Sequence, residues 1–343
     1  MKKSKIIFFT LLVCVSSWLG INVKADETAQ ANGGYTIEGV ANEHQIDPNV
    51  SYFYLREEPG AVDQLKVKLI NQSDAEKTLH VKVTNGNTNA NGLIDYTGKL
   101  ADHKTLNTPL TSLLKPQEEE VKVPANGEAI ATLDLKMPEK EQEGIILGGI
   151  VVSDLTNKDT SNKQLSVENT YSYTLGVVLT NQEADPVMSV NEGVDLTLEN
   201  VEAKLVAGKK VVQADIVNPN PYILEKSTVE GEILQAEGEK VVQTHKTENV
   251  RMAPYSVYPF QFDWKKEELK PGDYIFKGRV ISEKNTWEFT QKFTISEEQT
   301  KIINKESTFK VQIPSWLIWS LWIMVITSLI STLYILFVKG GKE

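Results

Sequence analysis

The sequence predicts an all-β protein, and three observations support this fold class. Apolar and polar residues alternate over several short segments, as expected for strands that bury one face. Such segments are 65–69, 79–83, 133–137, 171–179 and 287–295. Turn-forming pairs, among them Asn91-Gly92 and Pro271-Gly272, lie between the segments. The signal for helices between residues 26 and 315 is weak by comparison.

Many short strands joined by frequent turns are typical of antiparallel sandwiches. We therefore expect two immunoglobulin-like antiparallel β-sandwich domains, covering residues 35–153 and 165–296. A polar stretch over 154–169 would link them, and a polar stalk would follow over 297–315. The segment 171–180 either closes the first domain or opens the second, and the boundary at 165 assigns it to the second.

One segment departs from the alternating pattern. Residues 145–152 are continuously apolar apart from two glycines. A central strand that is buried on both faces has this composition, and so does a short helix in a core. We interpret the segment as a central strand, although periodicity alone does not exclude the helix.

The first 25 residues have the layout of a secretory signal peptide. Lys2, Lys3 and Lys5 precede an apolar stretch over 6–21, and the small residue Ala25 ends a cleavage site. Polar residues interrupt the apolar stretch, which argues against a retained membrane helix. Cys14 follows the branched residue Val13, which argues against a lipoprotein signal. The pattern predicts a chain that is secreted and then processed.

The other end of the sequence predicts a membrane anchor. Residues 316–338 form an uncharged apolar run, long enough to cross a bilayer as a helix. Trp316, Trp319 and Trp322 would lie at one interface, and Lys339 and Lys342 would hold the short tail, 339–343, in the cytoplasm. No LPxTG-like sorting motif precedes the run. We expect a single-pass protein of the cell membrane, with its ectodomain facing the cell wall.

Charge and cysteine content limit the possible partners. Subtracting +4 for residues 1–25 and +1 for 316–343 from the total of −10 leaves −15 for residues 26–315. So acidic an ectodomain argues against nucleic acid as a partner. Cys14 is the single cysteine and would leave with the signal. A secreted domain without disulfides is more typical of a bacterial protein.

The sequence contains no recognisable catalytic or metal-binding motif. The four histidines, His44, His80, His103 and His245, are scattered without metal-ligand spacing. Acidic runs such as Glu118-Glu119-Glu120 are interpreted as solvated surface. We therefore expect no catalytic residue, no cofactor and no metal site. A cell-wall-active glycan hydrolase or an accessory sensor subunit remains the alternative.

Several motifs resemble those of the WxL-interacting proteins of Gram-positive bacteria. The sequence Thr-Asn-Ala-Asn-Gly-Leu-Ile-Asp-Tyr over 88–96 is similar to a motif of the first domain of that family. Further similarities lie at 137–138, 143–150, 169–173, 218–221 and 252–256. Tyr255 stands where the resemblance leads us to expect asparagine. The resemblance implies a surface protein whose first domain binds peptidoglycan or a secreted WxL-domain protein. It implies that the second domain binds a host extracellular protein or another protein ligand.

Five residues are candidates for ligand contact. Asn89, Asn91 and Tyr96 could hydrogen-bond sugar or peptide groups, and Tyr255 and Tyr258 belong to an aromatic cluster that could bind protein. Simpler interpretations exist for both groups. Asn and Gly suit tight turns without any ligand, and alternation over 258–264 suits a buried strand face. We rank these simpler interpretations ahead of ligand binding.

Overall fold

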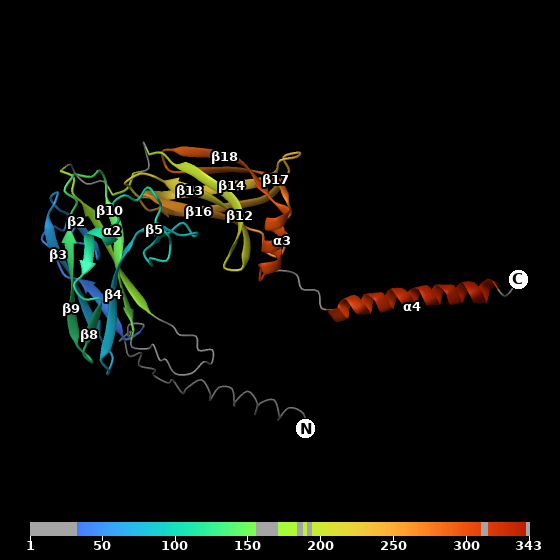
Figure 1. Ribbon diagram of the computed structural model, residues 1–343, viewed down its shortest axis with the longest axis horizontal. Coiled ribbons are helices and arrows are strands. Elements are labelled where there is room, and N and C mark those ends of the chain that lie inside the picture. Colours follow the sequence, from blue (N-terminus) through green and yellow to red (C-terminus); the bar gives the residue numbers. More distant parts are fainter. Residues whose placement is uncertain (1–32, 156–170, 184–187, 191–193, 310–314, 341–343) are drawn as a thin grey trace, which may run out of the picture.

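The computed structural model describes residues 33–155, 171–183, 188–190, 194–309 and 315–340 (Figure 1). Its strands form two β-sandwich domains, and two helices follow the second domain. In Figure 1 the strands of the first domain stand upright and those of the second lie across their upper end, so the two domains form an L. The predicted signal peptide, 1–25, and Lys342 lie outside the described residues.

The first domain consists of two packed sheets. One has the order β1 (Tyr35–Gly39), β3 (Val62–Asn71), β9 (Glu128–Lys136) and β7 (Leu114–Pro116). The other has the order β2 (Phe53–Arg56), β11 (Ser172–Thr180), β10 (Ile146–Asp154), β4 (Lys77–Asn85) and β8 (Glu120–Val123). A short helix, α2 (Leu110–Leu113), packs at one end. The pairs are antiparallel except for β2 with β11, which is parallel.

The alternating segments of the sequence supply the core of this domain. Leu65, Val67 and Leu69 on β3 and Leu79 and Val81 on β4 are fully buried. Polar residues at the positions between them face outward, because successive side chains of a strand point to opposite faces. The alternation therefore predicted both the strands and their buried faces.

The second domain is also a two-sheet sandwich. One sheet has the order β12 (Thr197–Val206), β13 (Lys209–Asn218) and β16 (Ser256–Asp263). The other has the order β15 (Val241–Met252), β14 (Leu224–Gln235), β17 (Gly272–Ile281) and β18 (Thr286–Ile295). Tyr258, Phe260 and Phe262 on β16 are at most 1 % exposed and form the centre of the core. This confirms the interpretation of that aromatic alternation as a core strand.

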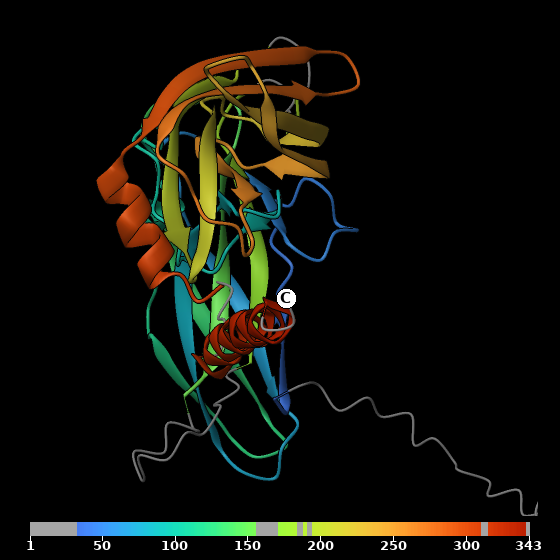
Figure 2. The same ribbon diagram turned by 90° about the vertical axis from the view of Figure 1, so that its right-hand side faces the viewer.

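Two predicted boundaries are wrong. Strand β11 pairs with β10 and β2 of the first domain, and its Val177 and Leu179 are buried in the first core, so 171–180 closes that domain. The expected stalk is partly a helix, α3 (Glu297–Glu306), which Ser296 caps and whose Ile303 packs into the second core. Figure 2 shows α3 along one side of the second domain.

The apolar run over 145–152 becomes the central strand β10, as predicted. Its side chains alternate between two apolar environments: Ile146 and Ile150 enter the core of the first domain, while Leu147 faces the second domain. Strand β11 repeats this division, with Val177 in the core and Val178 on the outer face. The outer face is apolar because the second domain covers it.

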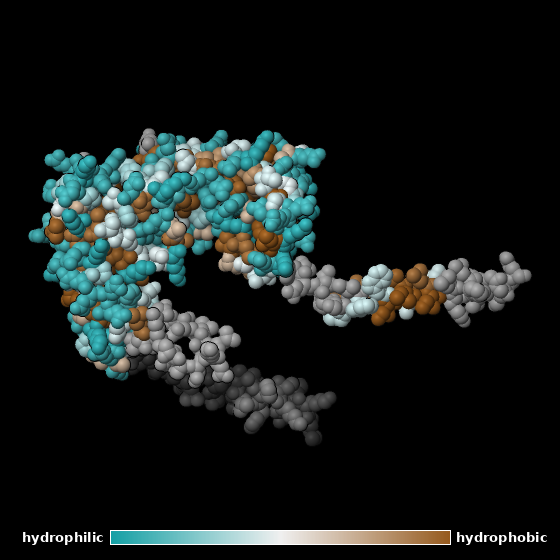
Figure 3. Space-filling view, viewed as in Figure 1, coloured by the Kyte–Doolittle hydropathy of each residue, from teal (hydrophilic) through white to brown (hydrophobic). Residues whose placement is uncertain are grey.

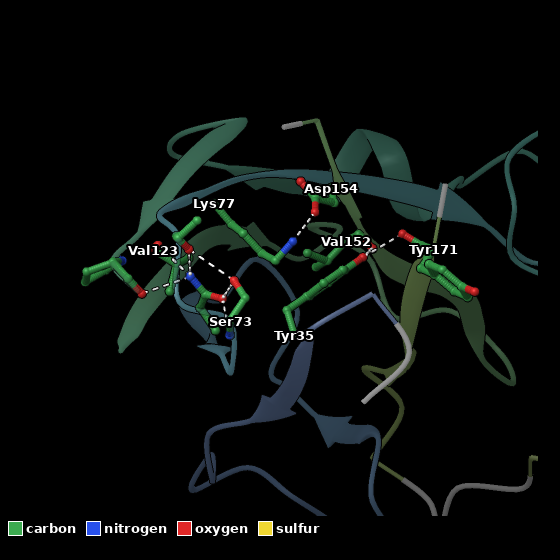
Figure 4. A network of polar contacts seen from close by, with 10 residues as sticks. Tyr35, Ser73, Lys77, Val123, Val152, Asp154 and Tyr171 are labelled. Atoms are coloured by element: carbon green, nitrogen blue, oxygen red, sulfur yellow. Dashed lines mark hydrogen bonds and ion pairs between the residues drawn. The ribbon is translucent and has the colours of Figure 1, made fainter. Parts of the chain in front are cut away.

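A buried polar network lies in the first sandwich (Figure 4). Lys77 Nζ lies 2.5 Å from Asp154 Oδ2. The side chain of Lys77 is 11 % exposed and that of Asp154 is 6 % exposed. The hydroxyl of Tyr35, fully buried beside them, lies 3.0 Å from Val152 O and 2.7 Å from Tyr171 O. Burial, followed by the nearby Asp154 charge, raises the pKa of Tyr35. The network joins β1, β4, β10 and the start of β11.

The last helix is α4 (Ser315–Gly340). Its described side chains over 316–332 are mostly exposed, and Figure 3 shows them as an apolar surface apart from the two domains. Among the described residues, no helix was found that is long and apolar enough to cross a membrane. The anchor expected over 316–338 therefore stays a prediction.

The ion pair of Lys77 and Asp154 provides a test of this fold. We expect Lys77→Met to lower the free energy of unfolding by about 3 kcal/mol, because it leaves a buried carboxylate without its cation. Lys77→Met with Asp154→Leu should recover much of that loss. In the exposed pair of Lys68 and Glu128, Lys68→Met should cost much less, because solvent screens this pair. Urea unfolding of residues 26–313 measures the free energy of unfolding of all three variants. Equal losses in Lys77→Met and Lys68→Met would contradict the burial of the pair of Lys77 and Asp154.

Candidate functional site

The motif segments of the two domains meet at the domain junction. The loop that contains β5 (Asn87–Thr88) and β6 (Ile94–Asp95) extends from the first domain to the second (Figure 1). There, the backbone N–H of Ala253 donates to Thr88 Oγ1 at 2.9 Å, and Thr88 Oγ1 lies 2.6 Å from Ser256 Oγ. Both hydroxyl-bearing residues are at most 1 % exposed. The segments 88–96 and 252–256 thus form one buried contact.

Gly92 brings the two backbones together in the same contact. The N–H of Arg251 donates to the carbonyl of Gly92 at 2.8 Å. Gly92 has a φ of +72°, and a Cβ atom there would lie 2.8 Å from Val250 Cγ2. Only glycine combines this left-handed backbone with so close an approach. The turn residues of the motif therefore serve the contact between the domains.

A second set of contacts between the domains lies in another part of the junction. The N–H of Ile145 donates to Pro221 O at 3.0 Å, and the Tyr222 hydroxyl donates to Glu143 Oε1 at 2.7 Å. Burial and then the bond to Glu143 raise the pKa of Tyr222 to about 12. Between these contacts, Gly144 has a φ of +74°, and a Cβ there would lie 2.3 Å from Pro221 O. No side chain fits at that position without moving the second domain.

An apolar cluster fills the space between these polar contacts. Its fully or nearly buried members come from both domains: Ile145, Leu147, Val178, Ile223 and Ala253. The half-buried Tyr52, Tyr54, Ile94, Tyr96 and Met188 surround them. Burying an aliphatic side chain contributes about 2 kcal/mol. The cluster therefore contributes more to domain association than the hydrogen bonds do, since each of these adds about 1 kcal/mol.

Ionic contacts lie at the exposed rim of the junction. Glu199 of β12 accepts from Lys104 and lies 3.0 Å from His103 Nε2, both of the first domain. Lys104 and then His103 hold the pKa of Glu199 below its usual value. Because Glu199 and Lys104 are exposed, solvent and salt weaken this contact, and it adds little to stability.

The junction accounts for three of the five candidate ligand residues. Asn89 Oδ1 accepts from the backbone N–H of Asn91 at 2.9 Å and of Leu93 at 3.3 Å. Asn89 therefore stabilises a tight turn, as the simpler interpretation of the sequence expects. Tyr96 packs in the interdomain cluster, and burial raises the pKa of its hydroxyl. Tyr255 lies beside the junction, half-buried. Asn91 is exposed at the tip of the loop.

The backbone explains why asparagine is expected at position 255. Tyr255 has a φ of +52°, in the left-handed region that Asn tolerates far better than tyrosine does. The expected Asn would suit the left-handed turn between β15 and β16. Tyr258, the fifth candidate, is fully buried in the second core.

Two sets of residues come together in the fold although the sequence did not predict their contact. Thr88 and Ser256 lie in separate motifs, and nothing in their spacing indicates that their hydroxyls meet. His44, Glu57 and Asp63 also come together, although no metal-ligand spacing connects them. A signal for the junction did exist, since the run over 145–152 was apolar at every non-glycine position. A strand that is apolar on both faces needs a cover for each.

An open groove lies on the second domain, across strands β14, β15, β17 and β18. It has a volume of about 680 Å³ and is lined by charged and polar side chains, among them Glu230, Thr244, Lys246, Lys277, Arg279 and Glu288. Arg279 forms an ion pair with Glu230 within the groove. Phe289 also belongs to the lining, and this mixture of charged, polar and aromatic groups is suited to a protein segment or a peptide.

Comparison with known families agrees with this two-domain architecture. Residues 35–154 match the family described as WxL Interacting Protein, peptidoglycan binding domain, and residues 162–305 match WxL Interacting Protein, host binding domain. The chain belongs to the family of WxL-interacting proteins. The second match begins before β11, whereas strand pairing assigns β11 to the first sandwich. It ends within α3, which agrees with α3 being part of the second domain.

Solved structures similar to this chain include two bacterial chaperones. The CupB2 chaperone of Pseudomonas aeruginosa shares 12 % identity, over 68 % of this chain and 93 % of that one, with a TM-score of 0.29. The DraB chaperone of E. coli shares 13 % over 76 % and 98 %, with a TM-score of 0.28. A search of curated proteins found no match.

Gly144 provides the sharpest test of the junction. We expect Gly144→Ala to destabilise the protein well beyond the roughly 1 kcal/mol that a left-handed alanine costs. The reason is that its Cβ must displace Pro221. Gly238, with a φ of +75° and nothing within 4 Å of a Cβ, is the matched control for backbone strain alone. Hydrogen exchange should show faster exchange of the Ile145 amide in Gly144→Ala than in Gly238→Ala. Equal exchange in both variants would contradict the junction.

Proposed function

We propose that this chain is a non-enzymatic scaffold and adhesion protein of the bacterial cell surface. The first domain contacts peptidoglycan, and the second binds a protein, either a secreted WxL-domain protein or a host extracellular protein. The proposal rests on the match of both sandwiches to families of binding domains. That match favours binding over the alternative of a glycan hydrolase.

The domain junction supports a bridging role. A protein that connects the wall to a second protein holds the two at a defined separation if its own domains are fixed. Buried hydroxyl contacts, glycine-dependent backbone contacts and an apolar cluster all join the domains here. Binding of a partner then does not have to fix the relative orientation of two loosely connected domains, which would cost free energy.

The groove of the second domain supports protein capture. Strand β15, twelve residues long, forms one edge of the sheet β15-β14-β17-β18, next to the groove. An extended segment of a partner can add to such an edge through backbone hydrogen bonds. Charged residues on both sides of the groove would then select among partner side chains.

Among the candidate ligand residues, Asn91 is best suited to glycan contact. It is exposed at the loop tip, next to Leu93, which is 51 % exposed. Asn89, Tyr96 and Tyr255 would act on a ligand indirectly, by holding that loop against the second domain. Tyr258 would have no direct part, since it lies in the core.

The proposal retains the membrane anchor over 316–338 and the signal peptide over 1–25. Trp316 and Trp319 are 69 % exposed and Trp322 is 60 % exposed on α4. An apolar helix surface of this extent is unfavourable in water, and insertion into a membrane would cover it. Lys339, close to the end of the apolar run, suits the cytoplasmic interface.

A binding experiment tests the proposal. Residues 26–313 contain every member of both cores, which lie between Tyr35 and Ile303. This protein would be incubated with purified cell-wall sacculi and, separately, with the secreted WxL-domain protein of the same organism. We expect co-sedimentation with sacculi, capture of the WxL-domain protein, and no release of soluble wall fragments.

Charge reversal separates the two activities. Lys246→Glu with Arg279→Glu in the groove should weaken protein capture about tenfold or more while sedimentation with sacculi is unchanged. Lys66→Glu with Lys68→Glu, both on the outward face of β3, change the net charge by the same amount and are the control. Binding to neither partner would refute the proposal, and release of wall fragments would favour the hydrolase instead.

A further inference from the structure

A buried carboxyl group in the first domain has an oxygen without a partner. The side chain of Glu57 is 2 % exposed, just after β2, where its backbone N–H donates to Thr180 O at 3.0 Å. Among the residues that the structure describes, none donates a hydrogen bond to Glu57 Oε1. Buried carboxylates are normally paired, because isolated charge is costly to bury. A buried oxygen of this kind needs a water, a proton or a bound ion as its partner.

His44 and Asp63 face the same carboxyl group. One nitrogen of His44 and one carboxylate oxygen each of Glu57 and Asp63 all lie within 4.8 Å of one another. His44 Nδ1 is 3.8 Å from Glu57 Oε2. Ligand atoms around a tetrahedral ion with bonds of about 2.1 Å are about 3.5 Å apart. His44 is the exposed member of the three. A side-chain rotation that moves its ring nitrogen by about 1 Å would bring that nitrogen to the ligand spacing of one ion.

The charges around the cluster favour a cation. His44 acts on Glu57 as an opposing positive charge, and Asp63 and Glu43 act on it as negative charges. The Asp63 side chain also shares a hydrogen bond with Glu57, so a proton or a cation must lie between these two carboxylates. Burial, more than the neighbouring carboxylates, raises the pKa of Glu57 to about 7. No lysine or arginine is among the groups acting on this carboxyl group. A bound divalent ion would supply the compensating charge.

Asn42 holds two members of the cluster in position. Its Oδ1 accepts from the backbone N–H of His44 at 2.8 Å, and its Nδ2 donates to Asp63 Oδ2 at 2.7 Å. The bond to Oδ2 orients the carboxylate of Asp63, which also shares a hydrogen bond with the Glu57 side chain. Outer residues orient metal ligands in the same way in known sites.

We propose that His44, Glu57 and Asp63 bind one divalent transition-metal ion, with Zn²⁺ as the best match. Zinc accepts one imidazole and two carboxylates, whereas Ca²⁺ and Mg²⁺ prefer oxygen ligands throughout. The ion would fasten the segment over 40–52 to strands β2 and β3. Tyr52, at the end of that segment, packs in the interdomain cluster. The metal would thus strengthen the first domain beside the junction.

Calorimetry on the full-length chain tests the proposal. The tag-free chain in detergent would be treated with a chelator, dialysed, and titrated with ZnCl₂ or CaCl₂ at pH 7.5. We expect one Zn²⁺ per chain and a higher melting temperature with zinc, because a ligand of the native state stabilises it. Glu57→Gln and Asp63→Asn should each weaken zinc binding by at least about tenfold.

Matched controls separate this site from adventitious binding. His103 and Glu199 form the other described histidine–carboxylate contact across chain segments, so His103→Ala should leave zinc affinity unchanged. Glu57→Gln removes a buried charge and is expected to fold, with a melting temperature that no longer responds to zinc. Absence of zinc binding, binding of Ca²⁺ alone, or zinc affinity unaffected by Glu57→Gln would each overturn the proposal.

Discussion

The arrangement of this protein depends on two neighbouring strands that are apolar on both faces. In β10 and β11, successive side chains alternate between the core of the first sandwich and the surface that meets the second domain. Covering the outer face of these strands is favourable by several kcal/mol, at about 2 kcal/mol for each buried aliphatic side chain. The hydrogen bonds of Thr88, Ser256 and the Gly144 segment add less energy. They determine how the two domains are oriented.

The motifs of the sequence take on a different meaning in this setting. Segments that resembled ligand-binding loops, 88–96 and 252–256, bind each other. Their asparagine and glycine residues form the turns that let two backbones approach closely, as at Gly92. Among the described residues, exposed surfaces outside this contact include the loop tip at Asn91, the groove of the second domain and the sheet edge at β15.

The sequence predicted local structure better than it predicted contacts. Alternation over 65–69 and 258–264 predicted strands and their buried faces, because that pattern depends only on the strand itself. It could not assign β11 to a domain, since an alternating strand fits either sandwich. The pairing of Thr88 with Ser256 was equally hidden, because it arises only when two domains pack. The two-sided apolar run over 145–152 was the one local pattern that required such packing.

The central claim is that the two sandwiches form one rigid unit. Spin labels on Lys66→Cys in β3 and Thr290→Cys in β18 report the distance between the domains, and both positions are exposed. Residues 26–313 contain no native cysteine, so the labels are specific. Pulsed electron paramagnetic resonance should give a single narrow distance distribution. A broad distribution would show that the domains move independently and would contradict the account.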